Sequence, residues 1–190
     1  MYFLDLLKKN SVIRRYIIMN SFDGALTILG ILIATYLAQL FDPKIIIVSS
    51  FGVIVSTGIS GIWGGYMAER AEKKKVKMEL EKHLMRSLSK TTLEKEMKKV
   101  AVFMGLANGL SSSIVSFIAI IPFFLATFEL ISVGDAFVYS FIIILISLFS
   151  LGYFIGKIAK ENVIFHGLMM IAVGAVVGIV LYLFELIKII

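Results

Sequence analysis

Five long apolar segments, interrupted by one long charged segment, constrain the fold of this chain more than any other feature. A helix needs about 20 apolar residues to cross a hydrocarbon core of about 30 Å. The chain is 190 residues long and 59% apolar, more apolar surface than a soluble core of that size could bury. The sequence therefore predicts an all-α integral membrane protein with five transmembrane helices, at residues 16–41, 44–68, 100–128, 136–158 and 163–187.

The charged segment, residues 69–99, separates the second predicted span from the third. It contains 11 of the 19 Lys and Arg residues and six carboxylates, Glu69, Glu72, Glu79, Glu81, Glu94 and Glu96. We accordingly divide the chain into three parts. Residues 1–66 hold an N-terminal segment and two spans, 67–99 form a charged helical insert, and 100–190 hold three spans.

The distribution of basic residues predicts how the chain is oriented. Seventeen of the 19 Lys and Arg residues fall in the N-terminal segment, the insert and the turn around 157–160, all on one side of the predicted spans. Cytoplasmic loops carry such an excess, so we expect a multi-pass protein of the cell membrane with its N-terminus and insert in the cytoplasm and its C-terminus outside. This asymmetry accounts for the net charge of +6 without a nucleic-acid partner.

The insert offers a possible metal-binding face. Residues 67–88 contain no Pro or Gly, which predicts a helix continuous with the second span. At 100° per residue, an arc of about 80° holds four potential ligands, which are Glu69, Glu72, Glu79 and His83. Thr91 and Glu94 form a capping-box pattern that predicts a second helix leading into the third span.

Two interpretations of this face remain open. The glutamates could pair with Lys73, Lys77 and Lys82 as a solvated surface. Alternatively, carboxylates and an imidazole could capture a divalent first-row cation. The chain has no cysteine, so any metal would have oxygen, imidazole or thioether ligands.

Asp23 is the sharpest single signal within the spans. It lies about two turns into the first span and is followed by the apolar run 25–38. An ionised carboxylate costs about 2.5–3.5 kcal/mol at the bilayer centre, so it is expected to face an ion pathway or a partner. The alternative is an aspartate at the membrane surface bonded to Arg14, Arg15 or Lys157.

The third span carries a polar stripe at Asn108, Ser112 and Ser116, each four residues apart. Such a stripe could line a hydrated pathway or could form hydrogen bonds to neighbouring helices. Glycines spaced four apart, at 61 and 65, 105 and 109, 152 and 156, and 174 and 178, predict faces for close helix packing.

The ordered set of these residues resembles the vacuolar iron transporter family. The resemblance runs from about residue 14 to the C-terminus and is carried by Arg14-Arg15, Asp23-Gly24, Gly64-Gly65-Tyr66, Ile121-Pro122-Phe123, Gly152-Tyr153, Gly156-Lys157, Gly167, Gly174 and Tyr182. It implies a homodimer with a pathway between subunits and proton-coupled export of Fe2+ or Mn2+. It also implies that Asp23 matches a metal-binding aspartate and that the insert matches a glutamate-rich metal-binding region.

Two departures from the family pattern concern metal ligands. Family members carry Met-x-x-Gly-Glu-Tyr in the second span, whereas Gly61 and Gly65 occupy the Met and Glu positions here. The insert is also shorter than the family's three-helix metal-binding domain.

We therefore predict a transporter with Fe2+ or Mn2+ as substrate, no permanently bound cofactor, and protons, membrane lipid and a second copy of the chain as partners. The rival hypothesis is a membrane scaffold whose basic segment binds anionic lipid or a protein partner. An enzyme is disfavoured because the chain has only two histidines, His83 and His166, and no recognisable catalytic arrangement.

Overall fold

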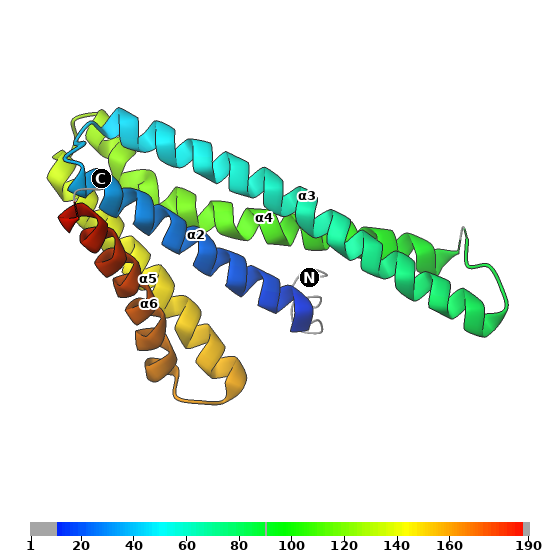
Figure 1. The fold of residues 1–190 in the computed structure, drawn as a ribbon. Coiled ribbons are helices and arrows are strands. Elements are labelled where there is room, and N and C mark those ends of the chain that lie inside the picture. The colour runs from blue at the N-terminus through cyan, green and yellow to red at the C-terminus, as the bar shows by residue number, and fades with distance from the viewer. Residues whose placement is uncertain (1–10, 90, 188–190) are drawn as a thin grey trace. The chain divides into compact units, whose positions relative to one another are not determined.

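The computed structural model describes residues 11–89 and 91–187, which form helices joined by short connections, with no strand among them. The five helices are α2 (Ser11–Leu37), α3 (Pro43–Leu84), α4 (Thr92–Thr127), α5 (Val133–Ala159) and α6 (Val163–Leu186) (Figure 1). Each is long and apolar enough to cross a membrane. The predicted all-α fold with five membrane-length helices is therefore confirmed. Lys8, Lys9, Lys90 and Lys188, which contribute to the predicted orientation, lie outside the described residues.

The first span ends earlier than predicted, at Leu37 rather than at residue 41. Gln39 adopts a left-handed conformation with φ of 56°. The N–H of Leu40 then donates to the carbonyl of Thr35 at 2.9 Å, which closes the helix end. Asp42 is the N-cap of α3, because its Oδ1 accepts a hydrogen bond from the Lys44 N–H at 2.9 Å.

Helices α3 and α4 continue into the charged segment. A helix of 42 residues such as α3 is about 63 Å long, twice the thickness of a hydrocarbon core. It ends at Leu84, followed by Met85 with φ of 46°. Thr91 caps α4 as predicted, since its Oγ1 accepts from the Glu94 N–H at 3.4 Å. The described part of the insert is therefore mostly an extension of two long helices.

The described residues form two compact units. Unit 1 comprises residues up to 20 and 56–111, and unit 2 comprises 21–55 and 112 onwards. In unit 1, α3 and α4 cross at their glycines. A Cβ atom placed on Gly61 would lie 2.7 Å from Cα of Gly109, and one on Gly105 would lie 2.6 Å from the carbonyl oxygen of Ile62. The predicted close-packing faces at 61/65 and 105/109 are thus confirmed.

Unit 2 contains an aromatic core and the hairpin of α5 and α6. The Phe137 ring lies 4.9 Å from that of Phe123 and 5.4 Å from that of Tyr36, both in edge-to-face contact. The core is completed by buried aliphatic residues on α2, α3, α4 and α5, such as Ile28, Leu32, Ile46, Ile120 and Ile144.

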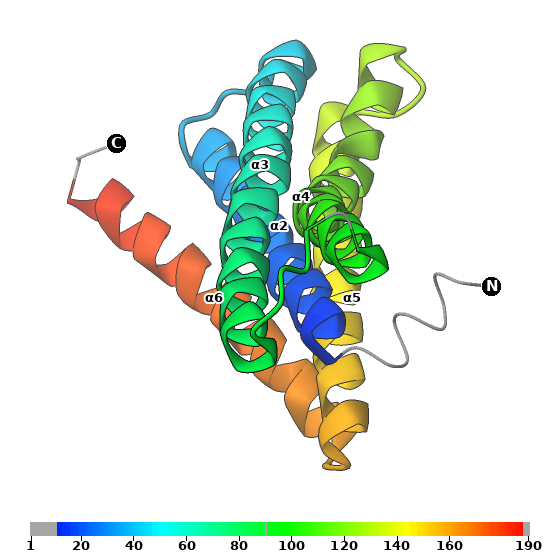
Figure 2. The same cartoon turned by 90° about the vertical axis from the view of Figure 1, so that its right-hand side faces the viewer.

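The α5 and α6 helices lie closest near their connecting turn and diverge away from it (Figure 2). A Cβ atom on Gly152 would lie 2.3 Å from the carbonyl oxygen of His166, so the helices meet backbone to backbone there. A Cβ atom on Gly174 would instead meet side chains, those of Leu148 at 3.0 Å and Leu29 at 3.3 Å. His166 Nε2 lies 2.6 Å from Oε2 of Glu161, within hydrogen-bond distance.

Candidate functional site

Asp23 lies on the exposed side of α2 in unit 2. The opposite side of the helix is buried, with Ala25, Ile28 and Leu32 all fully covered. Among the described residues of unit 2, no Lys, Arg or His lies within ion-pair distance of the Asp23 carboxylate. An acidic group on a membrane-length helix thus faces outward without a basic partner from the described part of its own unit.

Gly24 brings α2 against the serine stripe of α4. Ser116 Oγ donates to the Gly24 carbonyl at 3.0 Å, and both Ser112 and Ser116 are buried. A Cβ atom on Gly24 would lie 2.5 Å from the carbonyl oxygen of Ser112. The two serines therefore belong to a tight contact between α2 and α4, which turns the neighbouring Asp23 to the other side of the helix.

Asn108, the third member of the predicted polar stripe, lies in unit 1 and bridges helices. Its Nδ2 donates to the Gly61 carbonyl at 2.8 Å, and its Oδ1 accepts from Asn20 Nδ2. Asn20 in turn donates to the carbonyl of Tyr16 at 2.7 Å. Of the two alternatives that the sequence left open, these contacts favour hydrogen bonding between helices at Asn108.

The crossing of α3 and α4 leaves no room for the two ligands absent from the second span. A Cβ atom on Gly65 would lie 2.9 Å from Nδ2 and 3.0 Å from Cβ of Asn108. Gly61 is in contact with the backbone of Gly109 and accepts the Asn108 hydrogen bond. A methionine and a glutamate here would overlap α4. At the two positions where the family resemblance implies Met and Glu, this chain has a close contact between helices instead.

The predicted metal-binding face on α3 does not converge on one point. Glu69 pairs with Lys73 at 3.1 Å, while Glu72 and Glu79 are exposed. Glu72 and Glu79 are seven residues apart, about 10 Å along a helix axis, which is too far for one ion to bridge. Within residues 11–89 and 91–187 no group of three or more acidic, His or Cys side chains is placed to hold a metal ion.

Glu79 and His83 are the two residues of this face that are best placed to bind a metal ion together. They lie one turn apart and both are exposed. His83 Nδ1 lies 2.8 Å from the Glu79 carbonyl oxygen. Since a carbonyl oxygen only accepts, Nδ1 must be the donor, and in the neutral imidazole Nε2 then keeps its lone pair. That orientation suits metal ligation, in which the second ring nitrogen is held by an oxygen acceptor.

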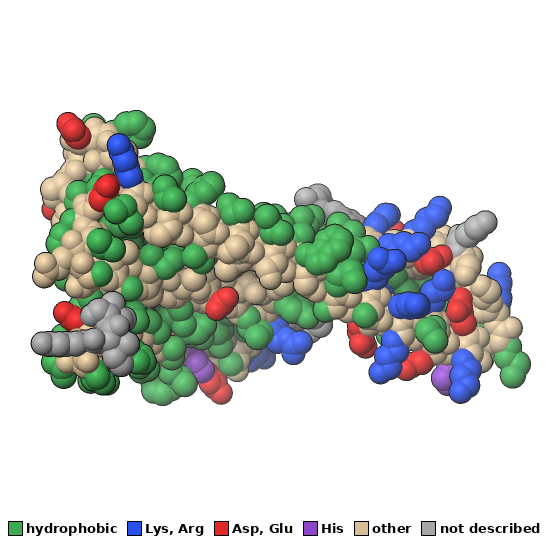
Figure 3. Space-filling model, turned by 45° about the horizontal axis from the view of Figure 1, so that its top comes forward, with side chains coloured by type: hydrophobic (Ala, Val, Ile, Leu, Met, Phe, Trp, Pro, Cys, Tyr) green, Lys and Arg blue, Asp and Glu red, His purple; other side chains and the backbone are tan. Residues whose placement is uncertain are grey.

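A hollow between α3 and α4 was not predicted from the sequence. It has a volume of about 260 Å³ and belongs wholly to unit 1. Its lining residues are Tyr66, Arg70, Lys73, Lys74, Lys77, Glu94, Met97, Lys98 and Ala101. Charged side chains gather where α3 and α4 are joined (Figure 3). The clustering of lysines signals a basic surface, but only the pairing of the helices creates the hollow.

The five membrane-length helices make this a multi-pass α-helical membrane protein. One of them exposes a carboxylate, and two of them extend into a charged segment. The VIT family model matches residues 78–185, more than half of the chain, and the chain belongs to this family. The uncharacterized protein MJ0645 of Methanocaldococcus jannaschii is 33% identical over 174 residues, covering 90% of this chain and 87% of that protein. No solved structure matches the chain. VIT family proteins are membrane transporters, and membership suggests metal-ion transport.

Proposed function

We propose that the chain is a homodimeric, proton-coupled exporter of Fe2+ or Mn2+ across the cell membrane, with Asp23 as its membrane carboxylate. The observation that carries this proposal is the exposure of Asp23 on α2 without an ion-pair partner among the described residues of unit 2. Burying an unpaired carboxylate in lipid costs several kcal/mol, so the group requires water, a cation or another protein surface beside it.

A second copy of the chain would supply that surface. Asp23, Thr27, Gly30 and Ala34 fall within an arc of about 60° on α2. A Cβ atom on Gly30 would have no neighbour within 4 Å. Small residues along one helix face permit close approach of a second membrane helix. If two copies pack along this face, two Asp23 carboxylates approach each other.

Two facing carboxylates account for the coupling of metal to protons. Carboxylate oxygens placed side by side would bind either one divalent cation or protons. A divalent cation balances two negative charges and competes for the same oxygens. Metal entry would then expel protons, and protonation from the other side would release the metal.

The exposed Glu79 and His83 would collect the cation at the surface. Carboxylate oxygen and imidazole nitrogen both bind first-row divalent cations. Only two ligands lie together there, so water completes the coordination shell. A weak site of this kind suits capture and release, because a transported ion must also leave.

Reconstitution into liposomes tests the proposed function. The purified chain is incorporated into vesicles, and entry of Mn2+ or Fe2+ is followed with a fluorescent indicator while a second indicator follows internal pH. We expect cation flux above that of protein-free vesicles, coupled to proton movement in the opposite direction. Vesicles containing the folded protein that pass neither cation faster than empty vesicles would refute the proposal.

A further inference from the structure

The hollow between α3 and α4 has a strongly positive lining. Five of its residues are cationic, namely Arg70, Lys73, Lys74, Lys77 and Lys98, and Glu94 is the only carboxylate among them. Glu94 is shared between Lys77 at 3.2 Å and Lys98 at 3.3 Å, and Lys73 pairs with Glu69. Such a lining disfavours a metal cation and favours an anion.

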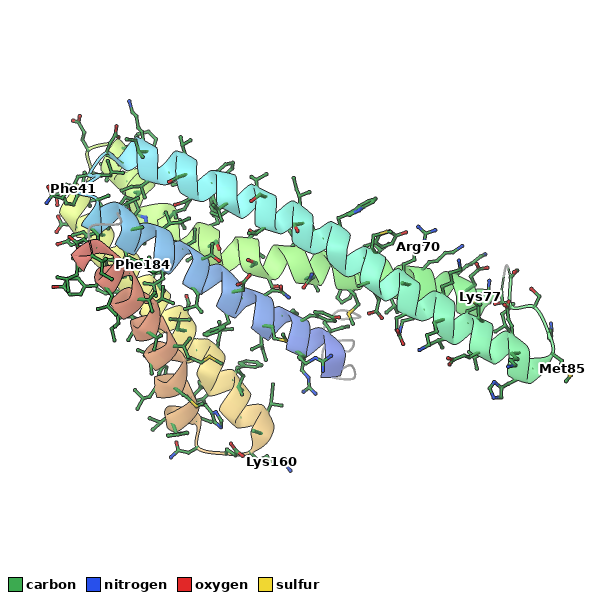
Figure 4. All side chains as sticks on the ribbon, viewed as in Figure 1. Phe41, Arg70, Lys77, Met85, Lys160 and Phe184 are labelled. Atoms are coloured by element: carbon green, nitrogen blue, oxygen red, sulfur yellow. The ribbon has the colours of Figure 1, made fainter. Side chains whose placement is uncertain are left out.

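Arg70 and Lys74 remain without carboxylate partners among the described residues. The Arg70 guanidinium lies over the Tyr66 ring, 5.9 Å from its centroid, which holds it beside the hollow. Arg70 and Lys77 both lie on the part of α3 beyond its apolar segment (Figure 4). A planar guanidinium held in place matches the oxygens of a phosphate group in a bidentate contact.

The remaining wall is apolar. It includes the Tyr66 ring, Met97 and the buried Ala101. One water occupies about 30 Å³ of liquid, so a hollow of about 260 Å³ accommodates a group of several heavy atoms. Cations around an apolar wall suit an amphiphilic phosphate ester rather than a bare inorganic ion.

The hollow also lies at a polarity boundary of the chain. The apolar part of α3 ends at Ala68 and charged residues begin at Glu69. Tyrosine is enriched at this level of membrane helices, where lipid headgroups lie. Basic pockets between membrane helices bind the headgroups of acidic lipids.

We propose that this hollow binds the phosphate group of an anionic phosphate ester, with Arg70 and Lys74 as the principal contacts. The position of the hollow favours an acidic phospholipid over a soluble ester. This site is separate from the carboxylates assigned to cation transport and does not depend on them.

Native mass spectrometry of the full chain in detergent tests the proposal. The probes are phosphatidylglycerol, neutral phosphatidylcholine, glycerol 3-phosphate and inorganic phosphate. The double variant Arg70→Gln/Lys74→Gln removes the two unpaired cations. Lys75→Gln/Lys95→Gln removes the same charge from exposed residues outside the hollow and serves as the control.

We expect the wild type and the control to retain phosphatidylglycerol over phosphatidylcholine, and the Arg70/Lys74 variant to bind phosphatidylglycerol about tenfold or more weakly. The chain could instead bind glycerol 3-phosphate or inorganic phosphate through these two residues and show no preference for phosphatidylglycerol over phosphatidylcholine. That result would support the phosphate site and assign it a soluble ligand. If both double variants lost binding of the phosphate probes equally, or if neither lost it, the proposal would be overturned. Should the double variant not fold, Arg70→Gln and Lys74→Gln are compared singly with Lys75→Gln by the same criteria.

Discussion

At the scale of single residues, the proposed role of Glu79 and His83 in cation capture can be tested separately from passage of the cation through the membrane. We expect His83→Gln or Glu79→Gln to raise the Mn2+ concentration at half-maximal flux several-fold and to leave the maximal flux unchanged. The reason is that the pair would act before the ion enters the membrane. Initial rates in liposomes over a range of Mn2+ concentrations measure both quantities.

The control for this pair is Glu96→Gln, which removes a carboxylate that pairs with Lys99 at 2.7 Å elsewhere in the same segment. It should behave as wild type. A fall in maximal flux for the His83 or Glu79 variants, with half-saturation unaltered, would place the pair on the pathway itself rather than at its entrance.

Asn108 illustrates a residue whose environment depends on several helices. Replacing it with leucine of similar size leaves the Gly61 carbonyl and Asn20 without its hydrogen bonds. We expect Asn108→Leu to lower the free energy of unfolding by about 1–2 kcal/mol. Thermal unfolding in detergent measures the loss. Ser49→Ala, which removes only bonds to its own helix backbone at Ile45 and Ile46, should change this free energy by less, and equal losses would contradict a bridging role.

The sequence identified several of these residues but not their partners. Asp23 is conspicuous because a carboxylate among apolar residues is costly wherever it points. The spacing of Asn108, Ser112 and Ser116 shows that they share one face of α4, but not which helix covers it. That depends on the register between helices, which is set by contacts such as Gly24 with Ser112.

At the scale of helices, the crossing of α3 and α4 provides a matched pair of glycines. Gly61→Ala would place a methyl group 2.7 Å from Gly109 Cα, whereas a Cβ atom on Gly64 meets nothing within 4 Å. We expect Gly61→Ala to cost about 1–3 kcal/mol through overpacking. Gly64→Ala should be neutral or stabilise the protein by about 0.5–1 kcal/mol, as alanine does in a helix.

Melting temperatures in the same detergent compare the two variants directly. A Gly61→Ala protein as stable as wild type would show that the backbones of α3 and α4 are too far apart at Gly61 and Gly109 for an added methyl group to overlap. Introducing the residues that the family resemblance implies, with Gly61→Met and Gly65→Glu, should be more damaging still, because both side chains would meet α4.

The helices themselves were largely predictable, because length and hydrophobicity determine which segments can cross a membrane. Their ends were less so. Gln39 and Met85 adopt left-handed conformations that usually call for glycine, so residue type gave no stop signal at either position. The capping of α4 by Thr91 was predictable because a hydroxyl three residues before a glutamate has a defined local geometry.

At the scale of the whole molecule, the proposed dimer can be tested by disulfide cross-linking. The sequence has no cysteine, so one introduced cysteine is the only thiol. If α2 packs against its counterpart along the Asp23 face, Gly30→Cys should give a disulfide-linked dimer on mild oxidation in membranes. The Cα atoms must come within about 7 Å for this bond to form.

Gly52→Cys on α3 is the control, because a Cβ atom on Gly52, as on Gly30, meets nothing within 4 Å. It should remain monomeric on a non-reducing gel. Cross-linking of both variants to the same extent would indicate random collision, and cross-linking of Gly52→Cys alone would place the interface on another helix.

The most direct test of the central claim is the flux of Mn2+ or Fe2+ through liposomes containing Asp23→Asn. The change keeps the size of the side chain and removes the charge for which, in the proposed mechanism, cation and proton would compete. Asp42→Asn is the matched control, because Asp42 lies in the turn before α3 and asparagine can still cap that helix. We predict that Asp23→Asn folds and loses cation flux while Asp42→Asn transports as wild type does, and undiminished flux through Asp23→Asn would contradict the account.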